Sequence, residues 1–328
     1  MKSIYLYSLL SMGGIAAFLA AGLGIASRAF HVDKDPRIDE VEEALPGANC
    51  GACGYAGCSS FAEAVVNGDA AIDGCPVGGE DVEEKIAEIL DAEASSAEGE
   101  VARVLCRGGN KETKKDSNYQ GIETCKAVDL MNGGNKSCQY GCLGYGDCVE
   151  VCPFDAIKMN ENGLPEVDPD KCTGCGKCVE ACPKNIITLY PSSKKNHIEC
   201  SSPESGKVVS KICEVGCIGC SMCVKVCPVD AITMEGDLAV IDYEECINCG
   251  LCAEKCPTGT ITFEGEKIKS IEITDDCVGC TLCVPACPVD AIDGEQKEIH
   301  EIDPEICVKC GICYDTCNVD GAIKVEYE

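Results

Sequence analysis

The sequence predicts an α+β protein: an N-terminal apolar helix followed by small cysteine-rich units. Three observations lead to this fold class. The 328 residues include 32 cysteines, most of them in closely spaced groups. A short apolar stretch follows the last cysteine of most groups, as expected for a strand. An uncharged run near the N-terminus is long enough for a membrane-spanning helix.

Composition limits both the stability and the partners of the chain. Aromatic residues make up 5% of it and tryptophan is absent, so a conventional apolar core is thin. Bound metal must therefore supply much of the folding energy. The net charge of −29 opposes binding to nucleic acid, whose phosphates would be repelled. The acidity serves solubility or a docking surface for a redox partner.

The predicted membrane anchor occupies residues 1–30. Ile4–Ala26 contains no charged side chain and spans roughly 34 Å as a helix, enough to cross a bilayer. More basic residues follow this span than precede it. The positive-inside rule then places the anchor in the cytoplasmic membrane with the rest of the chain in the cytoplasm. A cleaved signal peptide is the alternative interpretation.

A small helical domain is expected over residues 31–91, followed by a linker over 92–100. We predict helices over Ile38–Leu45, 59–68 and Asp81–Glu93. The domain contains one complete four-cysteine set, with a zinc knuckle as the alternative to a [4Fe–4S] cluster: Cys50, Cys53, Cys58 and Cys75. The linker composition suggests that this domain moves relative to the rest.

The remainder repeats the spacing C-x2-C-x2-C-x3-C-P, which is that of bacterial two-cluster ferredoxins. In that arrangement the fourth cysteine of each group ligates the neighbouring cluster. The second unit, 196–266, then has the sets Cys217, Cys220, Cys223, Cys256 and Cys227, Cys246, Cys249, Cys252. The third unit, 267–328, has the sets Cys277, Cys280, Cys283, Cys317 and Cys287, Cys307, Cys310, Cys313.

The first unit, expected over 101–195 together with a lead-in segment, departs from this spacing. Tyr145 occupies the position of the middle cysteine in its first group, and Cys138 is the nearest replacement. We therefore predict the irregular set Cys138, Cys142, Cys148, Cys182 beside the regular set Cys152, Cys172, Cys175, Cys178. Short strands are expected over 156–159, 186–189, 231–234, 260–263 and 322–325.

These assignments give seven [4Fe–4S] clusters from 28 cysteines. Zinc is disfavoured because structural zinc sites use cysteine pairs or cysteine with histidine, and the chain has three histidines. Disulfides are disfavoured because neighbours this close cannot all pair. Four cysteines are left over, and an eighth cluster is possible if they also ligate iron: Cys106, Cys125, Cys200 and Cys213.

The lead-in segments of the first two units are similar to each other. Their alignment through KSCQYGC and KICEVGC makes Cys106 correspond to Cys200, and Cys138 to Cys213. Because this repeat assigns the spare thiols to separate units, it favours seven clusters. Buried thiols in the lead-in strands are the alternative to an eighth.

No residues for bond-making catalysis are expected. The sequence lacks a G-x-G-x-x-G fingerprint after a strand and lacks a P-loop. His31, His197 and His300 stand alone and are interpreted as surface or structural residues. What remains is a series of one-electron carriers on a membrane anchor.

The chain resembles the B subunit of the Rnf complex over essentially its full length. The resemblance rests on the anchor followed by LPGANCGACGYAGC, and then on VLCRGG, YQGIETC, YGCLGYGDC and CPFDAI. It implies an electron-entry subunit of a membrane complex that oxidises reduced ferredoxin, reduces NAD and pumps Na⁺ or H⁺. By this resemblance soluble ferredoxin meets the C-terminal units, and the N-terminal cluster passes electrons to the other subunits.

Two other functions stay open from the sequence alone. One is a stand-alone polyferredoxin-like carrier or store, and the other is an input subunit of a different membrane reductase or hydrogenase. An acidic ferredoxin would need basic residues to dock. Two lysine groups could form this patch or could simply be solvated loops: Lys111, Lys114 and Lys115, or Lys194 and Lys195.

Overall fold

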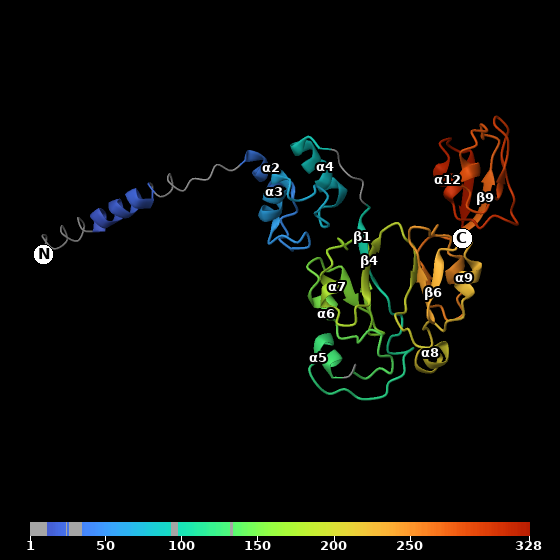
Figure 1. Cartoon of the computed structure of the whole chain (residues 1–328), viewed down its shortest axis with the longest axis horizontal. Coiled ribbons are helices and arrows are strands. Elements are labelled where there is room, and N and C mark those ends of the chain that lie inside the picture. The colour runs from blue at the N-terminus through green and yellow to red at the C-terminus, as the bar shows by residue number, and fades with distance from the viewer. Residues whose placement is uncertain (1–11, 24, 26–34, 93–97, 132–133) are drawn as a thin grey trace.

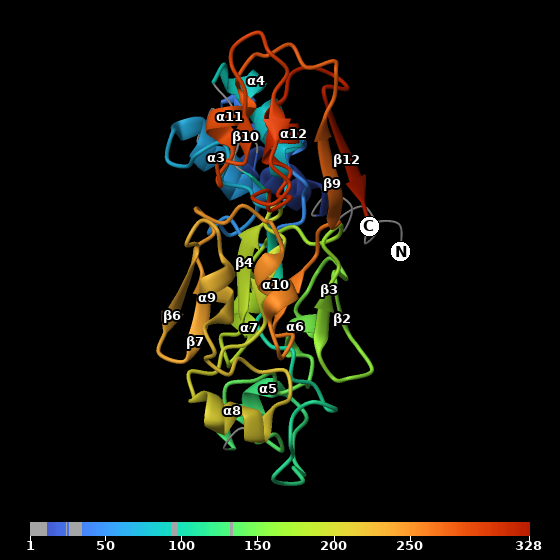
Figure 2. The same cartoon turned by 90° about the vertical axis from the view of Figure 1, so that its right-hand side faces the viewer.

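The computed structural model describes residues 12–23, 25, 35–92, 98–131 and 134–328. These residues form a helical domain followed by three units of short helices and two-stranded sheets. The first two units form a central block. The helical domain and the third unit lie at one end of it, and α5 (Cys125–Leu130) and α8 (Gly206–Ile212) at the other (Figures 1 and 2).

Part of the predicted membrane span falls within the described residues. Residues 12–23 are helical, and large apolar side chains such as Phe18 are exposed there. Within the described part of the chain, no helix has the length and apolar character needed to cross a membrane. The first part of the predicted span, residues 4–11, lies outside the described residues.

The N-terminal domain contains the three helices that the sequence predicts. They are α2 (Pro36–Ala44), α3 (Cys58–Asn67) and α4 (Gly79–Leu90). Asp35 accepts a hydrogen bond from the backbone N–H of Arg37 and so caps α2. Gly68 ends α3 with a φ of 79°, which glycine adopts without strain. Each helix contributes a large apolar side chain to the core: Val41, Phe61 and Ile86.

Each of the three following units contains two antiparallel strand pairs. The inner hairpins are β2 (Ile157–Met159) with β3 (Pro165–Val167), β6 (Ile232–Glu235) with β7 (Leu238–Ile241), and β10 (Ile292–Asp293) with β11 (Glu301–Ile302). The outer pairs are β1 (Glu100–Val104) with β4 (Ile187–Pro191), β5 (Asn196–Ile198) with β8 (Ile261–Phe263), and β9 (Ile268–Ile273) with β12 (Ile323–Tyr327). The predicted apolar strands are thus confirmed.

Each of the six cysteine groups in these units contains a short helix that includes its third cysteine and ends just before its fourth. They are α6 (Asp147–Glu150), α7 (Lys177–Ala181), α9 (Met222–Val226), α10 (Leu251–Lys255), α11 (Cys283–Ala286) and α12 (Ile312–Thr316). The core of each unit is small and includes cysteine itself. In the second unit Cys223 and Cys252 are buried beside Ile232 and Ile261.

The first two units are joined by direct contacts. Arg103 forms an ion pair with Glu264 at 2.5 Å, between Nη1 and Oε1. His197 stacks with Tyr190 and Tyr243, with ring centroids 5.6 and 5.9 Å away. Its Nδ1 lies 3.1 Å from the Tyr243 hydroxyl. The predicted structural histidine is therefore buried at the contact between two units, with 1% of its surface exposed.

We expect this contact to weaken in acid. Burial lowers the pKa of His197 to about 4, whereas an unfolded chain has a histidine pKa of about 6.5. The unfolded state therefore binds the proton first, and stability is lost as the pH falls from about 6.5 toward 4. Relative to a His197→Phe variant, the wild type should lose about 1 kcal/mol between pH 7.5 and pH 5.5. Anaerobic denaturant titrations at both values measure this, and parallel curves would contradict it.

Candidate iron–sulfur sites

The cysteines meet in groups of four, and none of the 32 forms a disulfide. In the N-terminal domain Cys50, Cys53, Cys58 and Cys75 line one cavity of about 330 Å³, as predicted from their spacing. Burial raises the pKa of the Cys75 thiol, and repulsion from Cys53 and Cys58 raises it further. Neutral thiols crowded in this way become favourable thiolates only when a metal replaces their protons.

The regular sets of the second unit also come together. Cys217, Cys220, Cys223 and Cys256 line a cavity of about 360 Å³. In the sister set, burial raises the pKa of Cys252 to about 12, with further repulsion from Cys249 and Cys246. Cys227 acts on Cys249 in the same way.

The remaining regular sets show the same proximity. In the first unit, burial and then repulsion from Cys172 and Cys175 raise the pKa of Cys178 to about 11. Cys152 packs in the same core cluster as Cys178. In the third unit burial raises the pKa of one thiol of each set, and repulsion from the other members of the same set raises it further. Cys277, Cys280 and Cys317 act in this way on Cys283, and Cys287 and Cys307 act on Cys310. Cys310 in turn acts on Cys313.

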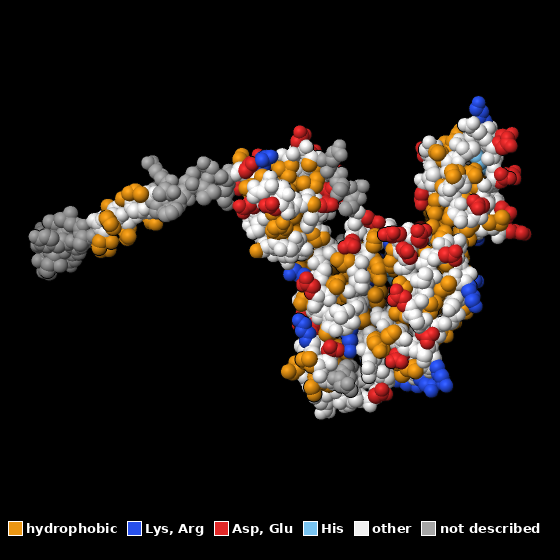
Figure 3. Space-filling model, in the orientation of Figure 1, with side chains coloured by type: hydrophobic (Ala, Val, Ile, Leu, Met, Phe, Trp, Pro, Cys, Tyr) orange, Lys and Arg blue, Asp and Glu red, His pale blue; other side chains and the backbone are white. Residues whose placement is uncertain are grey.

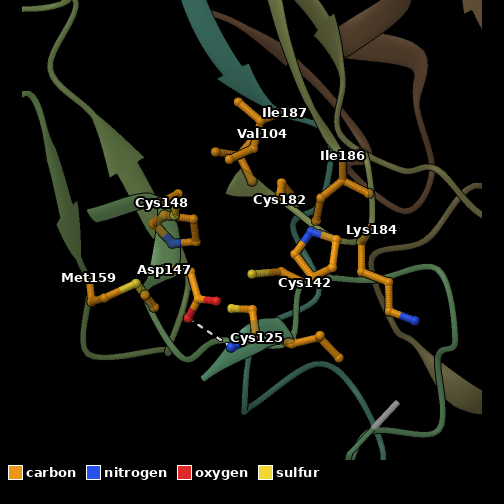
Figure 4. Close-up of a pocket in the computed structure, with 14 residues that line it drawn as sticks. Val104, Cys125, Cys142, Asp147, Cys148, Met159, Cys182, Lys184, Ile186 and Ile187 are labelled. Atoms are coloured by element: carbon orange, nitrogen blue, oxygen red, sulfur yellow. Dashed lines mark hydrogen bonds between the residues drawn. The ribbon is translucent and has the colours of Figure 1, made fainter. Parts of the chain in front are cut away.

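The irregular set differs from the prediction at one position. The cavity that contains Cys142, Cys148 and Cys182 is completed by Cys125, and Cys138 is not among its lining residues. Figure 4 shows the sulfur atoms of Cys125 and Cys142 directed toward the same space. Burial raises the pKa of Cys148 to about 12, and Cys125 is the first charged group that raises it further. Cys125 thus supplies the fourth thiol of this set, in place of the cysteine that the regular spacing would put at position 145.

Local hydrogen bonds explain why Cys125 reaches this cavity. Thr124 caps α5 by accepting a hydrogen bond from the backbone N–H of Ala127. Asp147 of α6 accepts hydrogen bonds from the backbone N–H groups of Cys125, at 2.7 Å, and Lys126, at 3.1 Å. The carboxylate therefore holds the N-terminus of α5 against the cysteine loop. The cysteine spacing does not predict this contact, because α5 ends at Leu130 and α6 begins only at Asp147.

Cys138 lies in a different cavity, which is lined also by Cys106, Cys200 and Cys213. The prediction that Cys138 joins Cys142, Cys148 and Cys182 is therefore wrong. Cys106, Cys200 and Cys213 are cysteines that the spacing analysis left without a cluster.

One histidine contacts a predicted ligand. His300 has 1% of its surface exposed, and its Nδ1 lies 3.4 Å from the sulfur of Cys277. The sequence shows His300 as an isolated residue, so this contact was not foreseen. Among the described residues His197 has no comparable sulfur partner, and His31 lies outside them.

The donor chemistry fits iron–sulfur clusters. Each cavity offers four thiols, which is the ligand set of a [4Fe–4S] cluster. Backbone N–H groups point at several sulfurs, as from Ala102 to Cys172 at 3.4 Å and from Ala291 to Cys287 at 3.2 Å. Such hydrogen bonds tune cluster potentials. Within the described ranges, no group of three or more histidine, cysteine or acidic side chains is arranged to hold a single metal ion.

The replacement of the missing ligand by Cys125 can be tested by substitution. We expect Cys125→Ser to lower the iron content by about four atoms per chain, because one cubane loses a ligand. Adding Tyr145→Cys should restore that iron, because position 145 is where the regular spacing places the ligand. Adding Tyr145→Ser instead should not restore it. Anaerobic iron and sulfide analysis measures the three variants, and full iron in Cys125→Ser would contradict the assignment.

Family models for iron–sulfur proteins match most of the cysteine groups. A model described as "Putative Fe-S cluster" matches residues 45–77. Models of a "4Fe-4S dicluster domain" match residues 216–260 and 276–321, and a second such model matches 239–293. A "4Fe-4S binding domain" model matches residues 165–188. Several [4Fe–4S] ferredoxin-like domains are therefore present.

Among solved structures, the chain is similar at 24% identity to part of a formate dehydrogenase–heterodisulfide reductase–formylmethanofuran dehydrogenase complex from Methanospirillum hungatei. The match covers 57% of this chain and 76% of that chain, with a TM-score of 0.24.

Relatives of known function are similar over most of their length. The B subunit of the Na⁺-translocating ferredoxin:NAD⁺ oxidoreductase complex of Acetobacterium woodii is 47% identical, over 71% of this chain and 70% of the relative. The proton-translocating counterpart of Clostridium ljungdahlii is 46% identical, over 67% and 78%. The B subunit of the ion-translocating oxidoreductase complex of Methanosarcina acetivorans is 43% identical, over 66% and 82%. The chain belongs to the family of Rnf complex B subunits, the iron–sulfur subunits of ion-translocating oxidoreductase complexes.

Proposed function

We propose that this chain takes electrons from reduced soluble ferredoxin and relays them to the flavin and iron–sulfur subunits of an ion-pumping ferredoxin:NAD oxidoreductase complex. Membership of the family supports a redox role within such a complex. The single observation that carries the proposal is that neighbouring cysteine sets of the ferredoxin units lie close together: Cys178 is near enough to Cys148, and Cys223 to Cys252, to raise the pKa of these buried thiols further. Clusters held in them can pass one electron at a time.

Contacts at the boundaries of the ferredoxin units support a relay that runs from the third unit toward the N-terminal domain. Burial raises the pKa of Cys249 in the second unit, and repulsion from Cys310 of the third unit raises it further. The two sets therefore approach each other across the unit boundary. At the other side of the molecule, the N–H of Ala102 donates to the sulfur of Cys172. Ala102 belongs to β1, which follows directly after the linker from the N-terminal domain.

The surface offers positions where an acidic donor could dock. Lys111, Lys114 and Lys115 are exposed. Basic side chains also gather over the α8 end of the central block in Figure 3, where Lys207 and Lys211 are exposed. The second predicted group is less available: Nζ of Lys194 donates to the carbonyl of Cys246, and Nζ of Lys195 to that of Ser192. We favour the first group as the basic patch.

We also propose that residues 4–26 anchor the chain in the cytoplasmic membrane, with the cluster domains on the cytoplasmic side. The uncharged sequence of this segment and the basic residues after it support this placement. The composition of the predicted linker, residues 92–100, supports a movement of the N-terminal domain toward the membrane partners.

The relay predicts where electron flow stops when one cluster is removed. In the purified complex, Cys58→Ser should abolish ferredoxin-driven NAD reduction, because the N-terminal cluster is the last carrier in this chain. Reduced ferredoxin should still bleach the absorbance of the remaining clusters. A Ser59→Ala variant, which keeps every thiol, is the control. Undiminished NAD reduction in Cys58→Ser would refute the order. Purification of the wild type as a lone carrier would favour a polyferredoxin-like store.

The anchor is tested by truncation. A chain that begins at residue 35 should move from the membrane fraction to the soluble fraction, because it lacks the apolar segment. Its iron content should match that of the full-length chain, because all the cysteines remain. Retention of the truncated chain in membranes lacking the other subunits would contradict this function of residues 4–26.

A further inference from the structure

Four cysteines that belong to none of the seven other sets surround one cavity between the first two ferredoxin units. Cys106 and Cys138 come from the lead-in segment of the first unit, and Cys200 and Cys213 from that of the second. The space that they line is about 420 Å³, similar to the 360 Å³ lined by the regular set that begins at Cys217. Because the regular set is expected to hold a cubane, a cavity of similar volume has room for one as well.

The four thiols are related by the internal repeat. Cys106 and Cys200 occupy corresponding positions, as do Cys138 and Cys213. The N–H of Cys142 donates to the Cys106 sulfur at 3.2 Å. The N–H of Cys217, the counterpart of Cys142, donates to the sulfur of Cys200 in the same way. Each repeat thus contributes an equivalent half of one site.

Backbone contacts hold the two halves together. Thr113 and Cys213 form an antiparallel bridge between the lead-in segments. On either side of it, the N–H of Lys114 donates to Ile212 O at 2.9 Å, and the N–H of Glu214 donates to Glu112 O at 3.0 Å. The cavity is therefore held in place by backbone hydrogen bonds between the two units.

The lining suits sulfur ligands of a bulky anionic group. A Cβ on Gly108 would lie 3.0 Å from the Cys213 sulfur, and one on Gly141 would lie 3.4 Å from both Cys106 and Cys138. The backbone N–H groups of Tyr140 and Gly141 form hydrogen bonds with the sulfur of Cys138. The hydroxyl of Thr113 donates to the sulfur of Cys213 at 3.8 Å. Donors therefore face sulfurs of both halves.

A buried ammonium group adds a charge argument. Lys136 has 8% of its surface exposed, and its Nζ donates to the carbonyls of Gly108 and Cys142 at 3.0 and 2.9 Å. None of the ion pairs among the described residues includes it. A buried cation is costly without a compensating charge. A thiolate-ligated cluster carries net negative charge and would supply that compensation beside Lys136.

We propose that Cys106, Cys138, Cys200 and Cys213 ligate an eighth [4Fe–4S] cluster, shared between the first two ferredoxin units. Ligation replaces four S–H bonds with four Fe–S bonds and releases four protons to solvent, without electron transfer. The site lies between the sets of Cys142 and Cys217, because backbone N–H groups of both residues reach its sulfurs. It therefore joins the carriers of the two units.

Paired substitutions test which thiols share a cluster. Cys138→Ser and Cys213→Ser should each lower the iron content by about four atoms per chain, and so should the double variant, since both remove one cubane. Cys138→Ser with Cys125→Ser should lower it by about eight, because these thiols belong to different cubanes. The double variant Cys125→Ser with Cys148→Ser is the matched control. It should lower the iron content by about four atoms, because both thiols belong to one cubane. Loss of only about four in Cys138→Ser with Cys125→Ser would overturn the assignment.

Native mass spectrometry of anaerobic wild-type protein counts the clusters per chain without any substitution, so it tests the proposal even if a variant fails to fold. We expect eight clusters, hence about 32 iron atoms, per chain. Seven clusters, or zinc in place of the eighth, would overturn this site. The site rests on the iron–sulfur function proposed above, and the two fail differently. Seven clusters would leave the relay intact, whereas protein without sulfide would overturn both.

Discussion

Bonding between thiolates and iron is the interaction on which this fold depends. The sheets of the ferredoxin units have two strands each, with two to six residues per strand, and isolated sheets of this size are marginal in water. Their cores are largely cysteine beside a few isoleucines, as in the group of Cys283, Cys313, Ile292 and Ile323. Because the fourth thiol of each group lies with the neighbouring set, ligation closes long loops that apolar packing alone could not fix.

Local spacing determined what the sequence could predict. Cys217, Cys220 and Cys223 lie on one tight loop, so their spacing alone identifies them as co-ligands, and the cavity contains them together with Cys256. The helices of the N-terminal domain and the apolar strands were predictable for a similar reason, since each is defined by residues near in sequence. The multi-unit α+β architecture follows from these local patterns.

The positions of the cysteines in the lead-in segments could not be predicted in this way. Cys125 reaches its cavity only because Asp147 holds the start of α5. Cys138, although nearest in sequence to the irregular group, is directed into the cavity shared with Cys213. The same holds for His300 beside Cys277 and for the buried Lys136, whose partners come from other segments. Tertiary contacts decide these positions, and one sequence does not display them.

The cavity between the first two units makes each unit depend on the other. Two cysteines from each repeat line it at corresponding positions, so a single repeat provides only half of the wall. The site is therefore complete only where two copies of the repeat lie together. Deletion of either copy would remove two of the four cysteines and open the cavity, so the two units form one indivisible structural pair.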